Sequence, residues 1–421
     1  MGEWLDWKTM TDPIVISDRT AFLQNAFAEK FGSPAGTHLV RAPGRVNLMG
    51  DHTDYNGLPV MPMAIQRDMM LLARERSDRH VTIASADPRF KPRVFELSGE
   101  LDPYAVGDWG NYAKAAGRAI AERFGPLRGF DAVVSSNIPI AAGLSSSSAL
   151  VMAVALTILD LADVAIGAPQ LMELVAGAER YVGTKGGGMD QAICLGAQPG
   201  TASRIDFNPL RLTPTPVPRH WRFVVAFSGV RAEKSGAIMA EYNGRTRECK
   251  QALNAATAAV GANEISTYAG LMSGVPVEDL LAALEQELDG LLFKRFRHVV
   301  TEATRVTHTE TAMKRDDIGE FGELMIQSHR SLSEDFEVSS AELDTLTDIA
   351  VNAGAVGARL TGAGFGGCVV ALCSAERVDQ VMEALEHEYY RSADINGMPV
   401  TDCLFVAVPS GGASVIEMRS R

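Results

Sequence analysis

The stretch PIAAGLSSSS, residues 139–148, is followed directly by the apolar run ALVMAVALTILDLA, residues 149–162. A strand that leads through glycine and small hydroxyl residues into a helix gathers free backbone N–H groups at the positive end of the helix dipole. Such a point can hold a phosphate, and the serine hydroxyls can add donors or a magnesium ligand. An N-capped core helix is the alternative interpretation, but four consecutive serines exceed what a cap needs. The pattern therefore predicts a phosphate-binding loop.

Strand-like and helix-like segments alternate on both sides of this loop. Short apolar runs predict strands at 132–140, 222–230 and 367–373, and longer periodic runs predict helices at 151–162, 170–182 and 277–296. No regular βαβ rhythm connects them, which favours an α+β fold with mixed sheets. A chain of 421 residues is long for one core, so we expect two closely packed domains. The proline-rich residues 212–220 are the best candidate junction, which gives domains 1–215 and 216–421 with the active site between them.

Composition narrows the classes of partner. The residues are 46% hydrophobic and 22% charged, and the formal net charge is −13, which argues against a general nucleic-acid or anionic-membrane surface. The N-terminal stretch MGEWLDWKTMTDP has no basic start, and no run of about 18 apolar residues occurs, so we expect a cytoplasmic protein without a membrane span. The five cysteines are scattered and lack metal-binding spacing, as is typical of reduced thiols.

A second segment, GRVNLMGDHTDYNG at residues 44–57, crowds Arg45, Asp51, His52 and Asp54 into a turn-rich stretch. A solvated surface loop is one interpretation. Carboxylates beside histidine and asparagine are also typical of sites that bind a polyhydroxylated ligand, because each hydroxyl can donate to a carboxylate and accept from a neighbour. A metal site is the weaker alternative, since the HxD spacing alone is a poor ligand signal.

Two glycine-rich segments complete the set. LTGAGFGGC, residues 360–368, contains GxGxxG, but the strand-like CVVALC follows it where a dinucleotide fold needs a helix. We predict a glycine turn between two strands, close to substrate or phosphate. GTKGGGMDQ, residues 183–191, lies just after Glu179 and contains Asp190, which could cap a helix or take part in catalysis. Two acids, an arginine and an anion loop form a coherent set for phosphoryl transfer.

In this order, GRVNLMGDHTDYNG, GLSSSSAL, GGGMDQ and LTGAGFGGC resemble the galactokinase branch of the GHMP kinases. WGNYAKA, EYNGRTREC, SHRSLSEDFEVSSAELD and LFVAVPSGG extend the similarity over most of the chain. The resemblance implies a two-domain GHMP kinase fold, with a mixed-sheet N-terminal domain and a C-terminal domain of antiparallel sheets and helices. It also implies an enzyme that uses ATP and Mg²⁺ to phosphorylate the C1 hydroxyl of D-galactose, giving galactose 1-phosphate and ADP.

Residue roles follow from the same resemblance. Asp190 matches the catalytic aspartate, and Arg45 matches its partner arginine. The positions that contact sugar hydroxyls are matched by Asp51, His52, Asp54, Gly187 and Tyr242. The ATP site is matched by Trp109 and Tyr112 for adenine, by Gly143, Leu144, Ser145, Ser146 and Ser147 for phosphate, and by Gly364. Ser147 and Glu179 match the magnesium ligands.

Departures from the family pattern bear on the substrate. Family members usually carry Glu where this chain has Asp51, and GTKGGGMDQ looks more like eukaryotic-style galactokinases and N-acetylgalactosamine kinases. An N-acetylgalactosamine 1-kinase or another sugar 1-kinase therefore stays open, although Tyr242 resembles the galactokinase tyrosine. A non-catalytic galactose and ATP sensor is disfavoured because the serine loop is full length. We expect small-molecule partners only, and a monomer or weak homo-oligomer.

Overall fold

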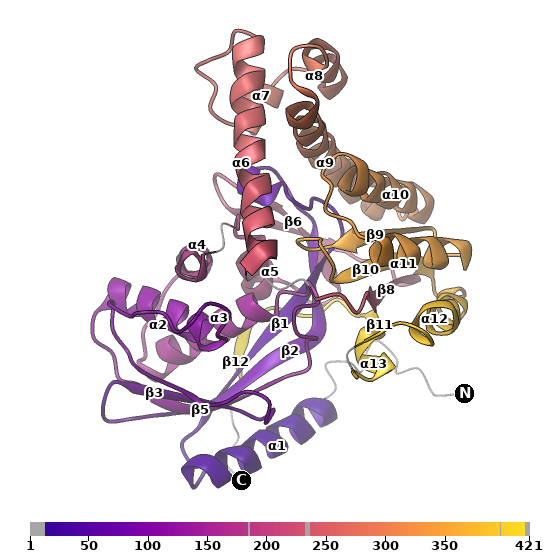
Figure 1. Cartoon of the computed structure of the whole chain (residues 1–421). Helices are drawn as coiled ribbons and strands as arrows, with labels where there is room; N and C mark the ends of the chain where they lie inside the picture. The colour runs from indigo at the N-terminus through magenta and orange to yellow at the C-terminus, as the bar shows by residue number, and fades with distance from the viewer. Residues whose placement is uncertain (1–12, 184–185, 232–235, 396, 417–421) are drawn as a thin grey trace.

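The computed structural model describes residues 13–183, 186–231, 236–395 and 397–416. The stretch 1–12, for which we expect no secretory signal, and residues 184–185 of the GTKGGGMDQ segment lie outside the described residues. The largest sheet has the strand order β12-β1-β2-β5-β3-β4, and all its pairs are antiparallel except β3 with β5 (Figure 1). Its strands are β1 (His38–Asn47), β2 (Pro62–Glu75), β3 (His80–Ser85), β4 (Arg93–Glu96), β5 (Phe130–Ser136) and β12 (Ser414–Ile416).

Helices cover both faces of this sheet, and the period of two along β2 explains how. Met70 and Leu72 pack with Leu23 and Phe27 of α1 (Pro13–Phe31), whereas Leu71 belongs to the main core on the opposite face. That opposite face is covered by α3 (Ser146–Leu161), with α2 (Gly110–Phe124) packed against α3. The helix predicted after the serine loop is therefore confirmed as a buried core helix.

The second sheet, β11-β8-β10-β9, is antiparallel throughout. Its strands are β8 (Trp221–Phe227), β9 (Gly357–Thr361), β10 (Cys368–Ser374) and β11 (Leu404–Ala407). The helices beside it are α10 (Ile318–Glu334), α11 (Ala341–Asn352), α12 (Val378–Leu385), the π-helical turn η4 (Glu386–Tyr390) and α13 (Val400–Cys403). The predicted glycine turn between two strands is confirmed, because β9 and β10 flank it.

Two long helices, α6 (Gly236–Ala259) and α9 (Gly290–Lys314), rise together away from both sheets, with α7 (Tyr268–Met272) and α8 (Val277–Leu284) at their far end (Figure 1). The single helix predicted at 277–296 is thus wrong. The structure breaks it between α8 and α9 because the Asp289 side chain accepts the N–H of Leu292 at 2.9 Å and caps a new helix.

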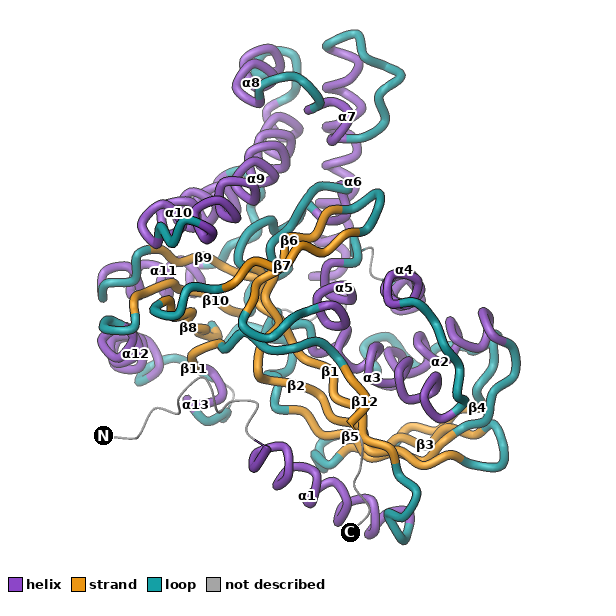
Figure 2. Tube along the Cα trace, turned by 180° about the vertical axis from the view of Figure 1, so that it is seen from behind, coloured by secondary structure: helices purple, strands orange, loops and turns teal. Residues whose placement is uncertain are grey.

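The remaining elements belong to neither of the two large sheets. They are the hairpin of β6 (Thr201–Asp206) and β7 (Arg211–Pro216), the helices α4 (Ala168–Ala178) and α5 (Met189–Gly196), and the short turns η2 (Asp54–Asn56) and η3 (Glu179–Val182). Figure 2 shows from behind how the hairpin bridges the halves. The proline-rich stretch thus contributes the strand β7, and the domain boundary near residue 215 stays a prediction.

One hydrophobic cluster runs from β1 to β11, so the two halves share a continuous core. The two-domain α+β architecture with a mixed sheet, predicted from the sequence, is confirmed. Within the described ranges, no helix combines the length and the apolar character needed to span a bilayer.

Candidate active site

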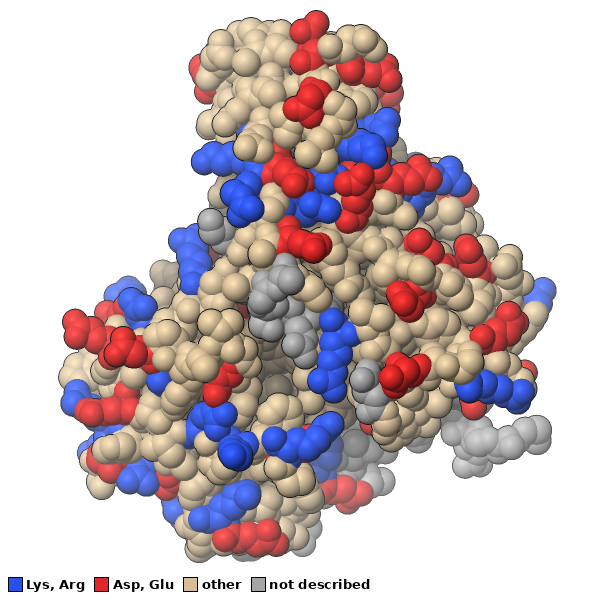
Figure 3. Space-filling view, viewed as in Figure 1, with Lys and Arg blue, Asp and Glu red and all other residues tan. Residues whose placement is uncertain are grey.

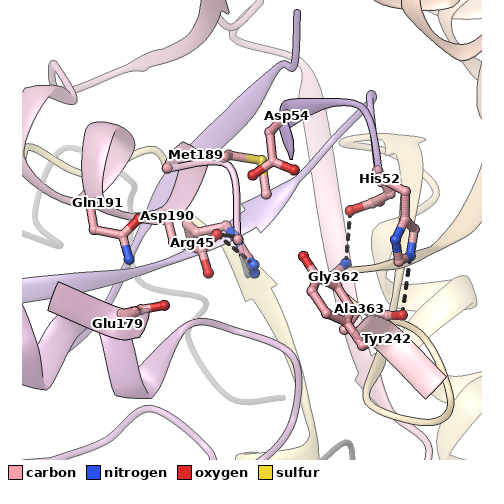
Figure 4. Close-up of a pocket in the computed structure, with 13 residues that line it drawn as sticks. Arg45, His52, Asp54, Glu179, Met189, Asp190, Gln191, Tyr242, Gly362 and Ala363 are labelled. Atoms are coloured by element: carbon pink, nitrogen blue, oxygen red, sulfur yellow. Dashed lines mark hydrogen bonds and ion pairs between the residues drawn. The ribbon is translucent and has the colours of Figure 1, made fainter. Parts of the chain in front are cut away.

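A small cavity lies between the halves, and Figure 4 shows the side chains around it. Its wall is formed by Arg45, Asp51, His52, Asp54, Glu179, Gly186, Gly188, Met189, Asp190, Gln191, Tyr242, Gly362 and Ala363. Three of the four predicted segments therefore meet here, together with α6. Gly187, which was also predicted, lines an adjoining cavity that shares Asp54.

Arg45 and Asp190 form a buried ion pair at the base of the cavity. Nε and Nη2 of Arg45 both lie 2.8 Å from Oδ1 of Asp190, and the two side chains are 5% and 11% exposed. Nη1 of the same guanidinium donates to the carbonyl of Gly143, and the Arg45 backbone N–H donates to that of Leu144 at 3.2 Å. Arg45 therefore connects the carboxylate directly to the serine loop.

The serine loop has the backbone geometry of an anion site. Gly143 and Ser145 have φ values of 75° and 61°, and α3 begins at the next residue, Ser146. The Ser145 hydroxyl is buried and has no hydrogen-bond partner among the described residues. An unpartnered donor at the positive end of a helix of 16 residues is suited to an anionic group.

The glycine turn packs onto the serine loop from the other half of the chain. A Cβ added at Gly362 would lie 2.8 Å from the carbonyl oxygen of Gly143, so only glycine permits this approach. Gly364, predicted at the ATP site, has a φ of 75° and lies against Val338, where a Cβ would meet the carbonyl oxygen at 2.4 Å. Gly364 lines neither of the two cavities described.

Asp54 and Gly187 form a further part of the wall. Oδ2 of Asp54 accepts the N–H of Gly187 at 3.1 Å, and Oδ1 accepts that of Tyr55 at 2.8 Å. A Cβ on Gly187 would lie 2.2 Å from the carbonyl carbon of Asp54, so this contact also requires glycine. Burial, and then the nearby Asp190, raise the pKa of Asp54 above its usual value.

His52 and Tyr242 close the opposite side. His52 Nε2 lies 3.2 Å from the carbonyl of Ala363 and Nδ1 lies 3.0 Å from the Tyr55 hydroxyl, so the proton belongs on Nε2 and Nδ1 accepts. Burial lowers the pKa of His52 well below 6.5, which keeps the ring neutral. Burial also raises the pKa of Tyr242 well above 10, so its hydroxyl remains a donor. The two rings are 5.7 Å apart.

Asp51 is the most enclosed carboxylate of the wall, with 2% of its surface exposed. Its Oδ1 accepts Asn47 Nδ2 at 3.0 Å and the N–H of Gly362 at 3.2 Å, and its Oδ2 is paired with Arg359. Burial raises the pKa of Asp51 to about 6, although the Arg359 charge opposes the shift.

Glu179 and the serine loop offer oxygen ligands for a hard cation. Glu179 is buried and accepts a hydrogen bond from Ser148, the fourth serine, whose role the sequence did not single out. Ser147, predicted as a ligand, is half-buried in the first turn of α3. In the described part of the chain no three His, Cys, Asp or Glu side chains are grouped to hold a metal by themselves. Mg²⁺ typically takes only one or two protein ligands and completes its shell with phosphate and water, so this donor set fits.

Trp109 and Tyr112, predicted for adenine, lie at the start of α2 and line neither cavity. Trp109 is half-buried with its ring centroid 6.4 Å from that of Phe90, and its indole N–H has no partner among the described residues. Figure 3 shows a hollow between the halves with Lys and Arg side chains near its rim, a local cationic setting on a chain of net charge −13. Cations beside a cleft attract a polyanion such as a nucleotide.

Sequence reasoning missed several residues of this site. Gln191 and Ala363 lie inside quoted motifs and line the cavity, but their types carry no chemical signal. Arg359 and Glu302 are fully buried behind Asp51. A charged residue within an apolar strand such as ARLT, or within a core-facing helix, is the signal that could have found them.

Comparisons with known proteins agree with this geometry. Residues 25–75 match the galactokinase galactose-binding signature, 111–197 match the GHMP kinases N terminal domain, and 309–391 match GHMP kinases C terminal. The chain is 40% identical over 362 residues to a galactokinase of Chloroflexus aggregans, with 86% of this chain and 90% of the relative covered. A galactokinase of Chloroflexus aurantiacus is 38% identical, with 87% and 91% covered.

Solved structures give the same result. The crystal structure of Lactococcus lactis galactokinase complexed with galactose matches with a TM-score of 0.83 and 31% identity, covering 95% of this chain and 99% of that one. The Methanococcus jannaschii mevalonate kinase, with a TM-score of 0.59, 20% identity, and 90% and 100% of the two chains covered, shares the fold. The chain therefore belongs to the galactokinase family of GHMP kinases.

Proposed function

We propose that this protein transfers the γ-phosphoryl group of ATP to the C1 hydroxyl of D-galactose, giving galactose 1-phosphate and ADP. The observation that carries the proposal is Arg45, which joins Asp190 to the serine loop inside a cavity lined by Asp54 and Tyr242. The predicted residues Asp51, His52, Asp54, Gly187 and Tyr242 surround the sugar, and the C1 hydroxyl of the sugar faces Asp190.

In the reaction, the C1 oxygen forms a bond to the γ-phosphorus while the bond from that phosphorus to the β,γ-bridging oxygen breaks. Asp190 orients the hydroxyl and receives its proton, and Arg45 stabilises the negative charge that develops on the phosphoryl oxygens. A carboxylate is a weak base towards an alcohol, so orientation and charge stabilisation contribute more to the rate than proton removal does.

The serine loop, Gly143 to Ser147, holds the phosphates through its backbone N–H groups and hydroxyls, and Trp109 and Tyr112 take the adenine, with Gly364 shaping the cleft. Ser147 and Glu179 would hold Mg²⁺, which, when bound, neutralises phosphate charge. We also expect a cytoplasmic protein that works as a monomer or weak homo-oligomer.

An ADP-release assay tests the proposal, with purified protein, Mg²⁺ and a panel of galactose, N-acetylgalactosamine, galactosamine and arabinose. We expect galactose to give the highest kcat/KM, because the buried Tyr242 hydroxyl suits a 2-hydroxyl better than a bulkier acetamido group. Preferred turnover of N-acetylgalactosamine would move the assignment to the related sugar 1-kinase. Absence of ADP release on every sugar would contradict the proposal and favour a sensor.

A further inference from the structure

Arg359 is a fully buried arginine that reaches from one half of the chain to the other. It lies on β9 of the second sheet with no exposed surface, yet its guanidinium contacts the loop that follows β1. Nη1 donates to the carbonyl of Leu48 at 3.0 Å, and Nη2 donates to Oδ2 of Asp51. A planar guanidinium can make both contacts at once, which a lysine ammonium cannot match.

The Asp51 carboxylate connects Arg359 to the glycine turn, because it accepts hydrogen bonds from both. A carboxylate offers about four acceptor positions, and three of those of Asp51 are used by Asn47, Gly362 and Arg359. Gly362 and Ala363 line the cavity, and the Ala363 carbonyl fixes the His52 ring. Most of the acceptor positions of Asp51 are therefore occupied by protein groups that hold the cavity wall in place.

Glu302 on α9 completes the cluster and braces the same loop. It has no exposed surface, its Oε1 lies 3.5 Å from Arg359 Nη1, and it accepts the N–H of Gly50 at 2.8 Å. His298, one turn earlier on α9, lies 3.1 Å from the backbone carbonyl of Asp51 through its Nε2. The second half of the chain thus holds the loop from Leu48 to Asp51 through four contacts, one at Leu48, one at Gly50 and two at Asp51.

We propose that Arg359 is a positioning residue for the sugar: it touches no substrate, but it fixes the loop of residues 48–54 and the glycine turn at the spacing that galactose needs. The inference rests on the proposed function. It assigns Asp51 the same indirect role, as the partner through which Arg359 acts. The polar contacts of the guanidinium that the structure describes are with Leu48, Asp51 and Glu302 and not with the serine loop, so its removal should affect the sugar far more than the nucleotide.

The test is Arg359→Lys in the full-length enzyme, with Arg41→Lys as the matched control. Arg41 also forms a buried pair with an aspartate, Asp68, but neither residue lines the cavities described. Both variants should lose thermal stability. Only Arg359→Lys should raise the KM for galactose, by about tenfold or more and by far more than the KM for ATP, because the guanidinium contacts the sugar loop directly and reaches the serine loop only through the glycine turn.

A galactose KM within twofold of wild type in Arg359→Lys would overturn the inference, as would an equal rise in the KM for ATP or an equal effect of Arg41→Lys. If Arg359→Lys cannot be purified, Asp51→Asn is assayed on a panel of monodeoxygalactoses. Positioning predicts the same loss of kcat/KM on every analogue, whereas a direct sugar contact would spare the analogue that lacks the contacted hydroxyl and would overturn the inference. Failure of the wild-type enzyme to phosphorylate galactose contradicts the proposed function instead.

Discussion

Two buried arginine–aspartate pairs flank the same cavity, and they differ in what lies behind the arginine. Arg45, paired with Asp190, also contacts the carbonyl of Gly143 in the serine loop. Arg359, paired with Asp51, lies instead against the carboxylate of Glu302. The first pair is 5% and 11% exposed and can meet substrate, whereas the second is 0% and 2% exposed and holds backbone. The third partner and the burial decide the role of each pair.

The largest effect should come from breaking the first pair with Asp190→Asn. The amide keeps an acceptor for Arg45 but has no negative charge and cannot take the C1 proton, so we expect kcat to fall by about 10³-fold. Steady-state ADP release measures the loss. The KM for ATP and the thermal unfolding midpoint should stay near wild type, and a near-normal kcat would remove Asp190 from the mechanism.

The second-largest effect should come from a substitution that leaves both pairs intact and displaces Asp54 in the cavity wall. Gly187→Ala places a Cβ where Asp54 lies, since an ideal Cβ there is 2.2 Å from the Asp54 carbonyl carbon. A shift of about 1 Å in a positioning group can cost about 10²-fold in rate, so kcat/KM for galactose should fall by that order.

Gly177→Ala is the control for this substitution. Gly177 lies in α4, and its added Cβ would meet nothing within 4 Å. Activity should be unchanged, and stability should rise by about 0.5–1 kcal/mol because alanine is the better helix former. Equal activity of the two variants would show that the close contact at Gly187 has no part in the sugar site.

The next effect in size is a pH dependence of activity that should arise from the Arg359–Asp51 pair and not from the Arg45–Asp190 pair. Burial raises the pKa of Asp51 to about 6. The charged and titratable groups that face it are Arg359, Arg45, Glu302, His298 and His52. Burial lowers the pKa of His298 to about 4 and that of His52 well below 6.5, and the pKa of Glu302 is held below its usual range. Among these groups, Asp51 is therefore the one that titrates between pH 5 and 7.

Protonated Asp51 no longer accepts from both Gly362 and Arg359, so kcat/KM for galactose should fall about tenfold from pH 7 to pH 5. Asp51→Asn should lack this step while keeping every other titration of the assay. The free energy of unfolding should change with pH in the opposite direction. The pKa of Asp51 in the folded protein lies above the ordinary 3.8, so folding favours the neutral carboxyl. The stabilisation from this group is therefore full below about pH 4 and is lost as pH rises through 6. A pH profile that is the same in both proteins would contradict the role of Asp51.

The smallest effect concerns Tyr242, which lines the same cavity. Tyr242→Phe removes one hydroxyl donor and keeps the ring packed 5.7 Å from His52. The loss of one hydrogen bond of about 1 kcal/mol should raise the KM for galactose about fivefold and shift the preference towards N-acetylgalactosamine. An unchanged ratio of kcat/KM for the two sugars would argue against a contact with the 2-hydroxyl.

Local patterns predicted the elements that depend on neighbours in the chain. The core helix after the serine loop and the glycine turn between β9 and β10 both follow from residue types a few positions apart. The helix expected at 277–296 was wrong because the Asp289 cap competes with an otherwise continuous apolar period. Several residues of the cavity wall were identified from local patterns and from the family resemblance. Of their supports, Asn47 lies inside the quoted segment 44–57 without a predicted role, and Arg359 and Glu302 were not singled out.

By itself, the sequence predicted the serine loop with its core helix, the glycine turn between two strands and the family, because glycine freedom, serine hydroxyls and apolar period act over a few residues. Only the tertiary structure decided which arginine meets which aspartate, since the Arg45–Asp190 and Arg359–Asp51 contacts join residues 145 and 308 positions apart. Buried charges must find partners wherever the chain brings them, and that choice depends on how the two halves close around one cavity.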